Sequence, residues 1–570
     1  MGLINKIWKT KLWLPVIIIL LAALNWLASL YHTRIDLTNE NRFTLSKPTK
    51  KILKAMDDVV QVDVFLKGDF PSGFKKLAGS TDEMLSEFKE VAGNKLQFRF
   101  ISPEDEVEGA NTKWADTLVA LGFSPLNLTS QVKAGQQQQN IFPIAFVHYH
   151  DQVMPVIIYE GKTKRITYPE INSAEAMMEY NFASAIDKVT AKDKPTLIYS
   201  AGNGEPMDGR TYDLSENVLK PNYKFQPVNL NVIPRIPDMV QVLMIVKPAI
   251  PFNDEEKLKI DQFVMRGGKL ILFTDKLNAE LDSLQSKKGE VIAYDRGLEL
   301  NDLLFKYGVR INPNLVMDLQ CDFLPFDVNG NGQFELLPWN YFPVFESKSN
   351  HPINKHLGFI SGRFVNTIDT VGAEGIRKTI LLSSSSNSRT IGTPALISVL
   401  ENVRAAENEK YKDTGLPVAV LLEGKFQSLF SNRLSQAMND SLQKYGATFL
   451  PQCIADNKII VVADGDMVLN SVVKGNQPIP MGMNPYTYGS QQEFPFANKD
   501  FLQNCLDYLI NTSGLSEAKA KDYTLRLLDK KKVDSEKMSW QLINIAVPVL
   551  LVILFALLYQ FLRRRKYSHR

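Results

Sequence analysis

The hydrophobic pattern of this 570-residue chain is dominated by one long uncharged run near each end. Residues 12–31 and 541–562 contain no acidic or basic side chain. Each run has about the 20 residues that a helix needs to cross the hydrocarbon core of a bilayer. The pattern therefore predicts one transmembrane helix at each end, with a large region of shorter periodic segments between them.

Basic residues flank both runs on the sides that face away from the central region. Lys6, Lys9 and Lys11 precede the first run, and a basic stretch at 563–566 follows the second. Because basic flanks stay in the cytoplasm, we expect an inner-membrane protein with both termini cytoplasmic and the central region in the periplasm. A cleaved signal peptide is the alternative for the first run, which is long for such a signal.

The charge balance separates these anchors from the central region. The chain has 65 Lys and Arg against 62 Asp and Glu, and eight of the basic residues lie in the acid-free terminal segments. The central region therefore carries a net charge of about −5. It shows no basic stripe with interleaved aromatics, so we expect no nucleic-acid partner. Three cysteines allow at most one disulfide, and Cys505 falls in a helical pattern that predicts a core position.

The first part of the central region alternates between strand and helix patterns. Residues 59–68 and 95–103 alternate apolar and polar positions, and 74–93 between them is amphipathic with helical spacing. This order is typical of a βαβ unit. The polar tract at 135–140 predicts a hairpin tip or loop. Two further strands follow at 141–161, and a clear helix at 171–190 closes this part.

A second α/β pattern begins after residue 194 with buried strands that alternate with helices. One helix has Asn253 as its expected N-cap and ends at Gly267. The fold class is therefore α/β, with two tandem extracytoplasmic α/β domains built on open mixed or parallel sheets and flanked by one transmembrane helix at each end. The expected boundaries are a cytoplasmic basic segment at 1–11, a transmembrane helix at 12–31, a first domain at 32–190, a second domain at 191–515 with a loop-rich insertion near 318–390, a juxtamembrane helical segment at 516–540, a transmembrane helix at 541–562 and a basic tail at 563–570.

A glycine-rich turn at 201–206 follows the first strand of the second domain. Open α/β sheets bind ligands where such turns end a strand, so Gly202, Gly204 and Glu205 are candidate contacts with a ligand or a partner. The turn does not complete the G-x-G-x-x-G dinucleotide pattern. A tight connection between strand and helix is the alternative interpretation.

Two segments contain residues of the kind that hold metal ions. Residues 327–332 match the first half of an EF-hand loop, but Pro338 stands where the bidentate glutamate belongs. His148 and His150 fall on one face of an expected strand, without an apparent third ligand. We expect turn and strand residues at these positions, and neither a metal nor another cofactor.

Catalytic motifs are sparse along the chain. It has no Walker A loop, no G-x-S-x-G elbow and no H-E-x-x-H helix, so we expect it to be neither an ATPase nor another enzyme. Asp464 and Asp466 follow a buried strand and could bind a metal, act as acid and base, or cap a helix. The alternative function is a membrane-anchored periplasmic hydrolase or glycan-acting enzyme that uses these carboxylates or Glu205.

Several segments of the chain resemble a known family. Those at 171–186, 195–205, 231–248 and 258–275 resemble the auxiliary-domain family of ABC-type transport systems. Those at 333–343, 416–430 and 458–470, with the final apolar run and its basic tail, are similar to gliding-motility-associated members of that family from Bacteroidetes. The resemblance covers nearly the whole chain, including both anchors.

The resemblance implies an accessory subunit, substrate-binding-like or coupling, of an ABC transporter complex. Its partners would be a multi-span permease, an ATPase that acts through the permease, and the lipid bilayer. The family supplies no catalytic residue to transfer. Polar residues in lipid usually face a helix partner, and we therefore expect Asn25, Ser29 and Asn544 to mark the permease-facing side of the two spans.

Overall fold

The computed structural model describes residues 18–23, 25, 44–132, 135–159, 168–286, 289–327, 331–347, 349–399, 408–473, 475–510, 514–520 and 530–567. Most of the expected first span, including Ser29, lies outside these residues. Within that span, residues 18–23 and Asn25 are helical and exposed. The chain forms two compact units, residues 1–522 and 523–570.

A four-stranded sheet with the order β2-β1-β5-β6 lies in the first part of the larger unit. Parallel strands β1 and β2 are joined by α4, which confirms the expected βαβ unit, and β5 and β6 pair antiparallel. The apolar side chains of β1 are fully buried and pack in one cluster with α4 and α6. The elements are α3 (Lys47–Ala55), β1 (Val60–Val64), α4 (Ser72–Ala92), η1 (Gly93–Lys95), β2 (Leu96–Phe100), α5 (Trp114–Ala120), β5 (Ile144–Tyr149), β6 (Gln152–Ile157) and α6 (Tyr168–Thr190).

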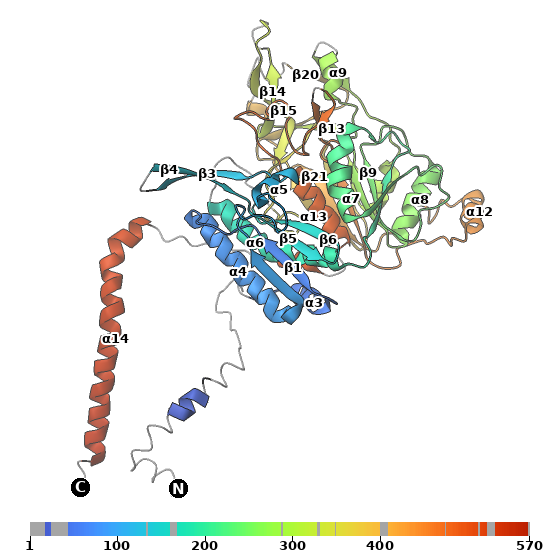
Figure 1. Ribbon diagram of the computed structural model, residues 1–570. Coiled ribbons are helices and arrows are strands. Elements are labelled where there is room, and N and C mark those ends of the chain that lie inside the picture. The colour runs from blue at the N-terminus through green and yellow to red at the C-terminus, as the bar shows by residue number, and fades with distance from the viewer. Residues whose placement is uncertain are drawn as a thin grey trace. The chain divides into compact units, whose positions relative to one another are not determined.

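The polar tract at 135–140 is a strand, so the expected loop at this position is wrong. It forms most of β4 (Gly135–Ile141), which pairs antiparallel with β3 (Leu126–Val132) over its whole length. The pair is a two-stranded ribbon that leaves the body of the fold (Figure 1). A ribbon without a third strand needs no apolar face, which is why its composition is that of a loop.

The main sheet has seven strands in the order β18-β21-β22-β10-β9-β7-β8. Strands β8, β7, β9, β10 and β22 are parallel, and β21 and β18 extend the sheet antiparallel at one edge. The sheet is therefore mixed. Its strands are β7 (Thr196–Ser200), β8 (Lys224–Val228), β9 (Val240–Val246), β10 (Lys269–Phe273), β18 (Ile376–Ser383), β21 (Pro417–Gly424) and β22 (Asn457–Val462).

Helices cover both faces of the main sheet, as the alternating pattern predicts (Figure 1). One face packs with η3 and α13, and the other with α8, α10 and α12. Helix α8 begins at the capping box formed by Asn253 and Glu256, as the sequence predicts for Asn253. The elements are η2 (Gly209–Thr211), the π-helical η3 (Asp213–Leu219), α7 (Lys220–Asn222), α8 (Asp254–Met265), α9 (Leu281–Ser286), α10 (Asn301–Tyr307), α12 (Gln436–Lys444) and α13 (Asn498–Ile510).

The insertion expected near 318–390 is rich in short strands. The strands of this region and its flanks pair mostly in twos. Those that carry Met317, Trp339 and Ile397 pack in a separate apolar cluster, whereas those that carry Val309 and Ile368 pack in the cluster of α8, and β18 returns to the main sheet. Both sheets belong to one compact unit, and the division into two domains near residue 190 stays a prediction. The strands are β11 (Glu290–Ala293), β12 (Val309–Ile311), β13 (Asn314–Asp318), β14 (Cys321–Phe326), β15 (Glu335–Phe345), β16 (Ile360–Ser361), β17 (Ile368–Thr370), β19 (Ser388–Gly392) and β20 (Ala395–Ser398), followed by η4 (Asn408–Lys410), β23 (Val472–Val473) and β24 (Gln477–Pro478).

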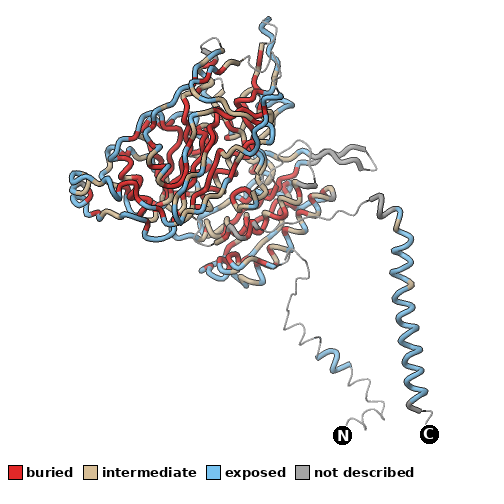
Figure 2. The backbone as a smooth tube through the Cα atoms, turned by 180° about the vertical axis from the view of Figure 1, so that it is seen from behind, coloured by how far each residue is buried: buried red, intermediate tan, exposed pale blue. Residues whose placement is uncertain are grey.

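The C-terminal unit contains one long apolar helix, α14 (Lys530–Tyr567). Its segment Ser535–Arg565 is long and apolar enough to cross a membrane, and its side chains are exposed (Figure 2). The expected second span at 541–562, with Asn544 exposed on it, falls inside this helix. Of the juxtamembrane helical segment expected at 516–540, residues 516–520 belong to the short 3₁₀ helix η5 (Leu515–Ala520) and residues 530–540 to α14, while 521–529 lie outside the described residues.

Candidate functional site

The order of the parallel strands places a topological switch point between β7 and β9. The chain runs from β7 to β8 on one side, and then crosses back to β9, β10 and β22 on the other. All five strands end at the same edge of the sheet, and the helices that follow β7 and β9 cover opposite faces. Ligands of open α/β sheets bind at such a crevice, which makes this edge the candidate site.

The glycine-rich turn after β7 packs directly against the loop after β9. The carbonyl oxygen of Asn203 accepts hydrogen bonds from the backbone N–H groups of Ala249 and Ile250, both at 2.8 Å. Gly204 has a φ of +80°, and a Cβ atom there would lie 3.0 Å from the Cβ of Ala249. At Gly202 a Cβ atom would lie 2.5 Å from Oδ1 of Asn229. Both glycines thus permit close packing, and their contact with a ligand or partner stays a prediction.

We expect Gly204→Ala to destabilise the protein more than Gly109→Ala. Both glycines have a φ of +80°, but nothing lies within 4 Å of a Cβ atom at Gly109. The left-handed backbone costs an alanine about 1–2 kcal/mol at either position, and only Gly204→Ala also crowds Ala249. Urea unfolding of the full-length protein in detergent measures both losses. Equal losses would contradict the close contact between the two loops.

Glu205 is buried beside this turn, and the structure adds Glu256, which the sequence analysis missed. Oε2 of Glu205 accepts a hydrogen bond from the backbone N–H of Asn203 at 2.6 Å. The side-chain amide of Asn203 donates to Oε2 of Glu256 at 3.3 Å. The same Glu256 oxygen accepts from the backbone N–H of Asn253 at 2.8 Å, which closes the capping box of α8. Asn203 therefore connects two carboxylates that lie far apart in the sequence.

An ionic cluster lies along the same edge, at the ends of β9, β10 and β22. It contains both sequence-predicted carboxylates, Asp464 and Asp466. Oxygen atoms of Asp275, Asp464 and Asp466 lie within 4.8 Å of one another. Nζ of Lys247 lies 2.6 Å from Asp466, 2.9 Å from Glu280 and 3.6 Å from Asp275. The three strands thus converge on one buried ammonium group.

The charges in this cluster shift the pKa values of its members. Burial raises the pKa of Asp275 to about 6, against the pull of Lys247. Burial also raises the pKa of Asp464 well above its usual range, and the neighbouring carboxylates of Asp275 and Asp466 add to the effect. Burial opposes the charged form of Asp466 as well, but Lys247 outweighs it and holds this pKa below its usual value. Burial similarly opposes charge on Lys247, yet the surrounding carboxylates raise its pKa.

The cluster is an internally paired network. Arg296 contacts Glu280 and lies 3.7 Å from Asp275, so a second cation supports Lys247. Asp464 accepts hydrogen bonds from the backbone N–H groups of Arg363 at 2.9 Å and Asp466 at 2.8 Å. A metal ion held by these carboxylates would have to displace the Lys247 ammonium. The arrangement therefore joins three strand ends electrostatically. Asp464 accepts its local backbone hydrogen bonds from a turn at 465–468 and not from a helix N-terminus, so the expected cap of a following helix is wrong.

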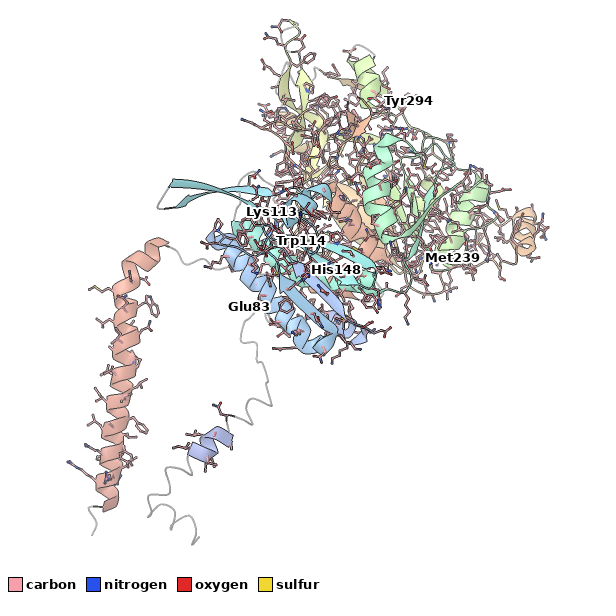
Figure 3. The ribbon with its side chains drawn as sticks, in the orientation of Figure 1. Glu83, Lys113, Trp114, His148, Met239 and Tyr294 are labelled. Carbon is pink, nitrogen blue, oxygen red and sulfur yellow. The ribbon has the colours of Figure 1, made fainter. Side chains whose placement is uncertain are left out.

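The other residues that the sequence singled out lie away from this edge. His148 lies on β5 in the first sheet, 3.3 Å from Asp63 (Figure 3). His150 lies past the end of that strand and 3.7 Å from Asp58, so the expected shared strand face is wrong. Asp327 accepts hydrogen bonds from backbone N–H groups of its own turn. Cys505 is buried in the core as expected.

A second group of charged residues surrounds a cavity of about 640 Å³ where α6, α13 and η5 meet. The hydroxyl group of Tyr180 donates to Asp507 at 2.6 Å, and Lys188 lies 3.1 Å from the same carboxylate. Nζ of Lys519 lies 3.9 Å from the centre of the Tyr180 ring and donates to Asn504. None of the carboxylates at the main-sheet edge lines this cavity.

Comparison with known proteins gives a family match. Residues 194–505 match the model of a family described as an ABC-type uncharacterized transport system, and residues 39–148 match a domain of unknown function, DUF7088. An uncharacterized protein of Borreliella burgdorferi is 19% identical over 548 residues, which are 94% of this chain and 94% of the relative.

Two solved structures show weak similarity. The mmIFT52 N-terminal domain is 13% identical, with a TM-score of 0.31, and the match covers 55% of this chain and 96% of that domain. The exo-beta-1,4-mannosidase Op5Man5 from Opitutaceae bacterium strain TAV5 is 9% identical, with a TM-score of 0.18, over 85% of this chain and 56% of the mannosidase. Both scores are too low to carry an argument about the fold.

Proposed function

The chain belongs to the ABC-type uncharacterized transport system family, and from this premise we propose that it is the coupling subunit of an ABC transporter complex. In this proposal it works with a separate multi-span permease and reaches the ATPase only through that permease. Its resemblance to gliding-motility-associated members leads us to propose that the complex serves gliding motility. In this proposal the larger unit of the chain transmits conformational change and catalyses no reaction.

The observation that carries the proposal is the packing of η5, the last described segment before the apolar helix in the sequence. The 3₁₀ helix η5 is built into the larger unit, because Leu515 and Ala518 belong to the apolar core of the first sheet. Only residues 521–529 separate η5 from α14 in the sequence. A short connection between a packed segment and a membrane-length helix can transmit a displacement of that helix.

The charged residues around the cavity hold η5 against the larger unit. Lys519 of η5 is buried against Tyr180 of α6 and Asn504 of α13. Asp507 of α13 in turn binds Tyr180 and Lys188 of α6. A movement of η5 would therefore act on one helix of each sheet at the same time. This arrangement supports a coupling role better than a solute-carrying one.

We further propose that both termini are cytoplasmic, that the protein spans the inner membrane twice, and that the larger unit is periplasmic. In this arrangement Asn25, Ser29 and Asn544 face the permease, because polar residues in lipid seek a helix partner. Asn544 is exposed on α14 in the isolated chain, as a surface that binds another helix must be.

Co-purification from native membranes tests the proposal. Tagged full-length protein, solubilised in mild detergent, should retain a multi-span permease and an ABC ATPase. The matched control replaces residues 541–562 with an unrelated apolar helix of the same length, which keeps the anchor and removes its specific surface. We expect the control to lose both partners. Full-length protein that purifies alone would contradict the proposal. If Asp464→Asn keeps both partners but loses function, the alternative of a carboxylate hydrolase would be favoured.

A further inference from the structure

Two buried carboxylates at the switch point have no basic partner among the residues that the structure describes. Glu205 and Glu256 are 6% and 1% exposed. Every ion pair found in the described part of the chain involves other acids, such as those that Lys247 binds in the neighbouring cluster. Charged groups that are buried in proteins are normally paired with an opposite charge or coordinate a metal.

The same region has four buried oxygen atoms without a hydrogen-bond partner among the described residues. They are Oγ of Ser200, Oδ1 of Asn203, Oε1 of Glu205 and Oε1 of Glu256. Asn203 connects the two glutamates. Its backbone N–H donates to Glu205, and its side-chain amide donates to Glu256. Its Oδ1 atom shares the amide carbon with the nitrogen that touches Glu256.

Ser200 belongs to the same region by its position on β7. Ile198 faces the cluster that contains the apolar side chains of α8. Side chains two residues apart in a strand point to the same face, so Ser200 also faces α8, the helix that carries Glu256. Its hydroxyl oxygen therefore lies on the α8 side of the sheet, at the start of the turn that carries Asn203 and Glu205.

The helix N-terminus does not balance two carboxylates. The N-terminus of α8 supplies about half a positive charge beside the Glu256 carboxylate, and neither glutamate forms an ion pair among the described residues. The free atoms are all oxygens, and oxygen ligands select hard cations.

We propose that this region binds one hard divalent cation, of the Ca²⁺ or Mg²⁺ class, through Asn203, Glu205 and Glu256. Ser200 supplies a further neutral oxygen. The acidic cluster at Asp275, in contrast, already holds the ammonium group of Lys247. The cation ties the turn after β7 to the start of α8, and so strengthens the contact between the two loops at the switch point.

Calorimetric titration of the full-length protein in detergent, after treatment with a chelator, tests the proposal. In this titration Ca²⁺ or Mg²⁺ should bind at one saturable site per chain. In a separate thermal melt the same ion should raise the unfolding temperature, whereas NaCl at equal ionic strength should do neither. Glu205→Gln and Glu256→Gln each remove one negative ligand of similar shape, and should weaken binding by roughly tenfold or more. Asp327→Asn is the matched control in the half EF-hand segment, and should bind as the unchanged protein does.

Three results would overturn the proposal. Absence of saturable binding to the unchanged protein would mean that buried water serves these oxygens, and this result does not depend on whether the variants fold. Unchanged affinity in both glutamine variants would place the ion elsewhere. Loss of binding in Asp466→Asn, with binding kept in Glu205→Gln, would assign the ion to the ionic cluster instead.

Discussion

Replacing Lys247 with methionine is expected to lower the free energy of unfolding of the full-length protein by about 3–5 kcal/mol. The methionine keeps most of the side-chain volume but removes the ammonium group that lies between Asp466, Glu280 and Asp275. Removal of one partner from a buried ion pair leaves an uncompensated charge, which costs far more than the pair itself contributes. Here a single substitution removes the one ammonium group that contacts all three carboxylates, while Arg296 contacts Glu280 and lies near Asp275.

The backbone at this residue adds to the argument. Lys247 has a left-handed conformation, with a φ of +47°. A non-glycine residue in this region costs about 1–3 kcal/mol and persists only where its surroundings hold it. Its backbone N–H donates to the carbonyl oxygen of Phe273 at 2.8 Å, and the contacts of its ammonium group add to this restraint. The same strain remains in the methionine variant, without the contacts that offset it.

The free energy of unfolding lost in Lys247→Met should be smaller at low pH, because the carboxylates around Lys247 are then protonated. The pKa of Asp275 is raised by burial to about 6 in the folded protein, above its usual value of 3.8. The folded state therefore takes up this proton first as the pH falls, and stability from this group increases between about pH 6 and pH 4. A variant without Lys247 has more carboxylate charge to relieve, so its deficit should be smaller at pH 5 than at pH 8.

Urea unfolding at both pH values measures the effect. Lys113→Met is the matched control, because its ammonium group lies 2.7 Å from Glu104 but both side chains are exposed. Surface pairs contribute little, so the control should unfold as the unchanged protein does at either pH. Equal behaviour of the Lys247 and Lys113 variants would show that the three strand ends are not joined by this ammonium group.

The second large effect is expected from Asp507→Asn, which should release η5 from the larger unit. Burial opposes charge on Asp507, but Lys188 and Lys519 outweigh it and keep the pKa of this carboxyl below its usual value. Burial lowers the pKa of Lys519 to about 8, against the pull of Asp507. Without the carboxylate, Lys519 loses its main counter-charge, and we expect a loss of about 3–5 kcal/mol at pH 7.

Hydrogen exchange at residues 515–520 is the readout that separates release of η5 from general destabilisation. We expect faster exchange there than in β9 or β22 of the same variant. Asp193→Asn is the control, because Asp193 lines the same cavity but is exposed and paired to Lys224 at the surface. Uniformly faster exchange in all elements of the Asp507 variant would contradict a specific role of this carboxylate in holding η5.

Local signals in the sequence predicted local structure well. The capping residue Asn253 and the glycine after α8 are recognisable because a cap depends on a few adjacent residues. The α/β class and the apolar helix at 541–562 followed from periodicity and length. The tract at 135–140 and His150 were interpreted wrongly, since a two-stranded ribbon and the end of a strand depend on pairing partners that a single segment does not reveal.

The candidate site required the strand order, which the sequence does not give. The sequence analysis missed Glu256, because its partner Asn203 lies 53 residues away. A signal was nevertheless present, because three buried strands are each followed within two residues by Lys247, Asp275 or Asp464. Parallel strands bring such residues to one edge of the sheet. The strand ends, compared together, would have indicated the ionic cluster.

The most direct test of the coupling account is hydrogen exchange of η5 within the purified transporter complex. The complex is compared in two states, without nucleotide and with the ATPase trapped by ATP and vanadate. The account predicts that exchange at residues 515–520 changes between the states, and that the Asp507→Asn complex shows no such change. Identical exchange of η5 in both states of the unchanged complex would contradict it, because the junction between body and membrane helix would then not respond to the ATPase.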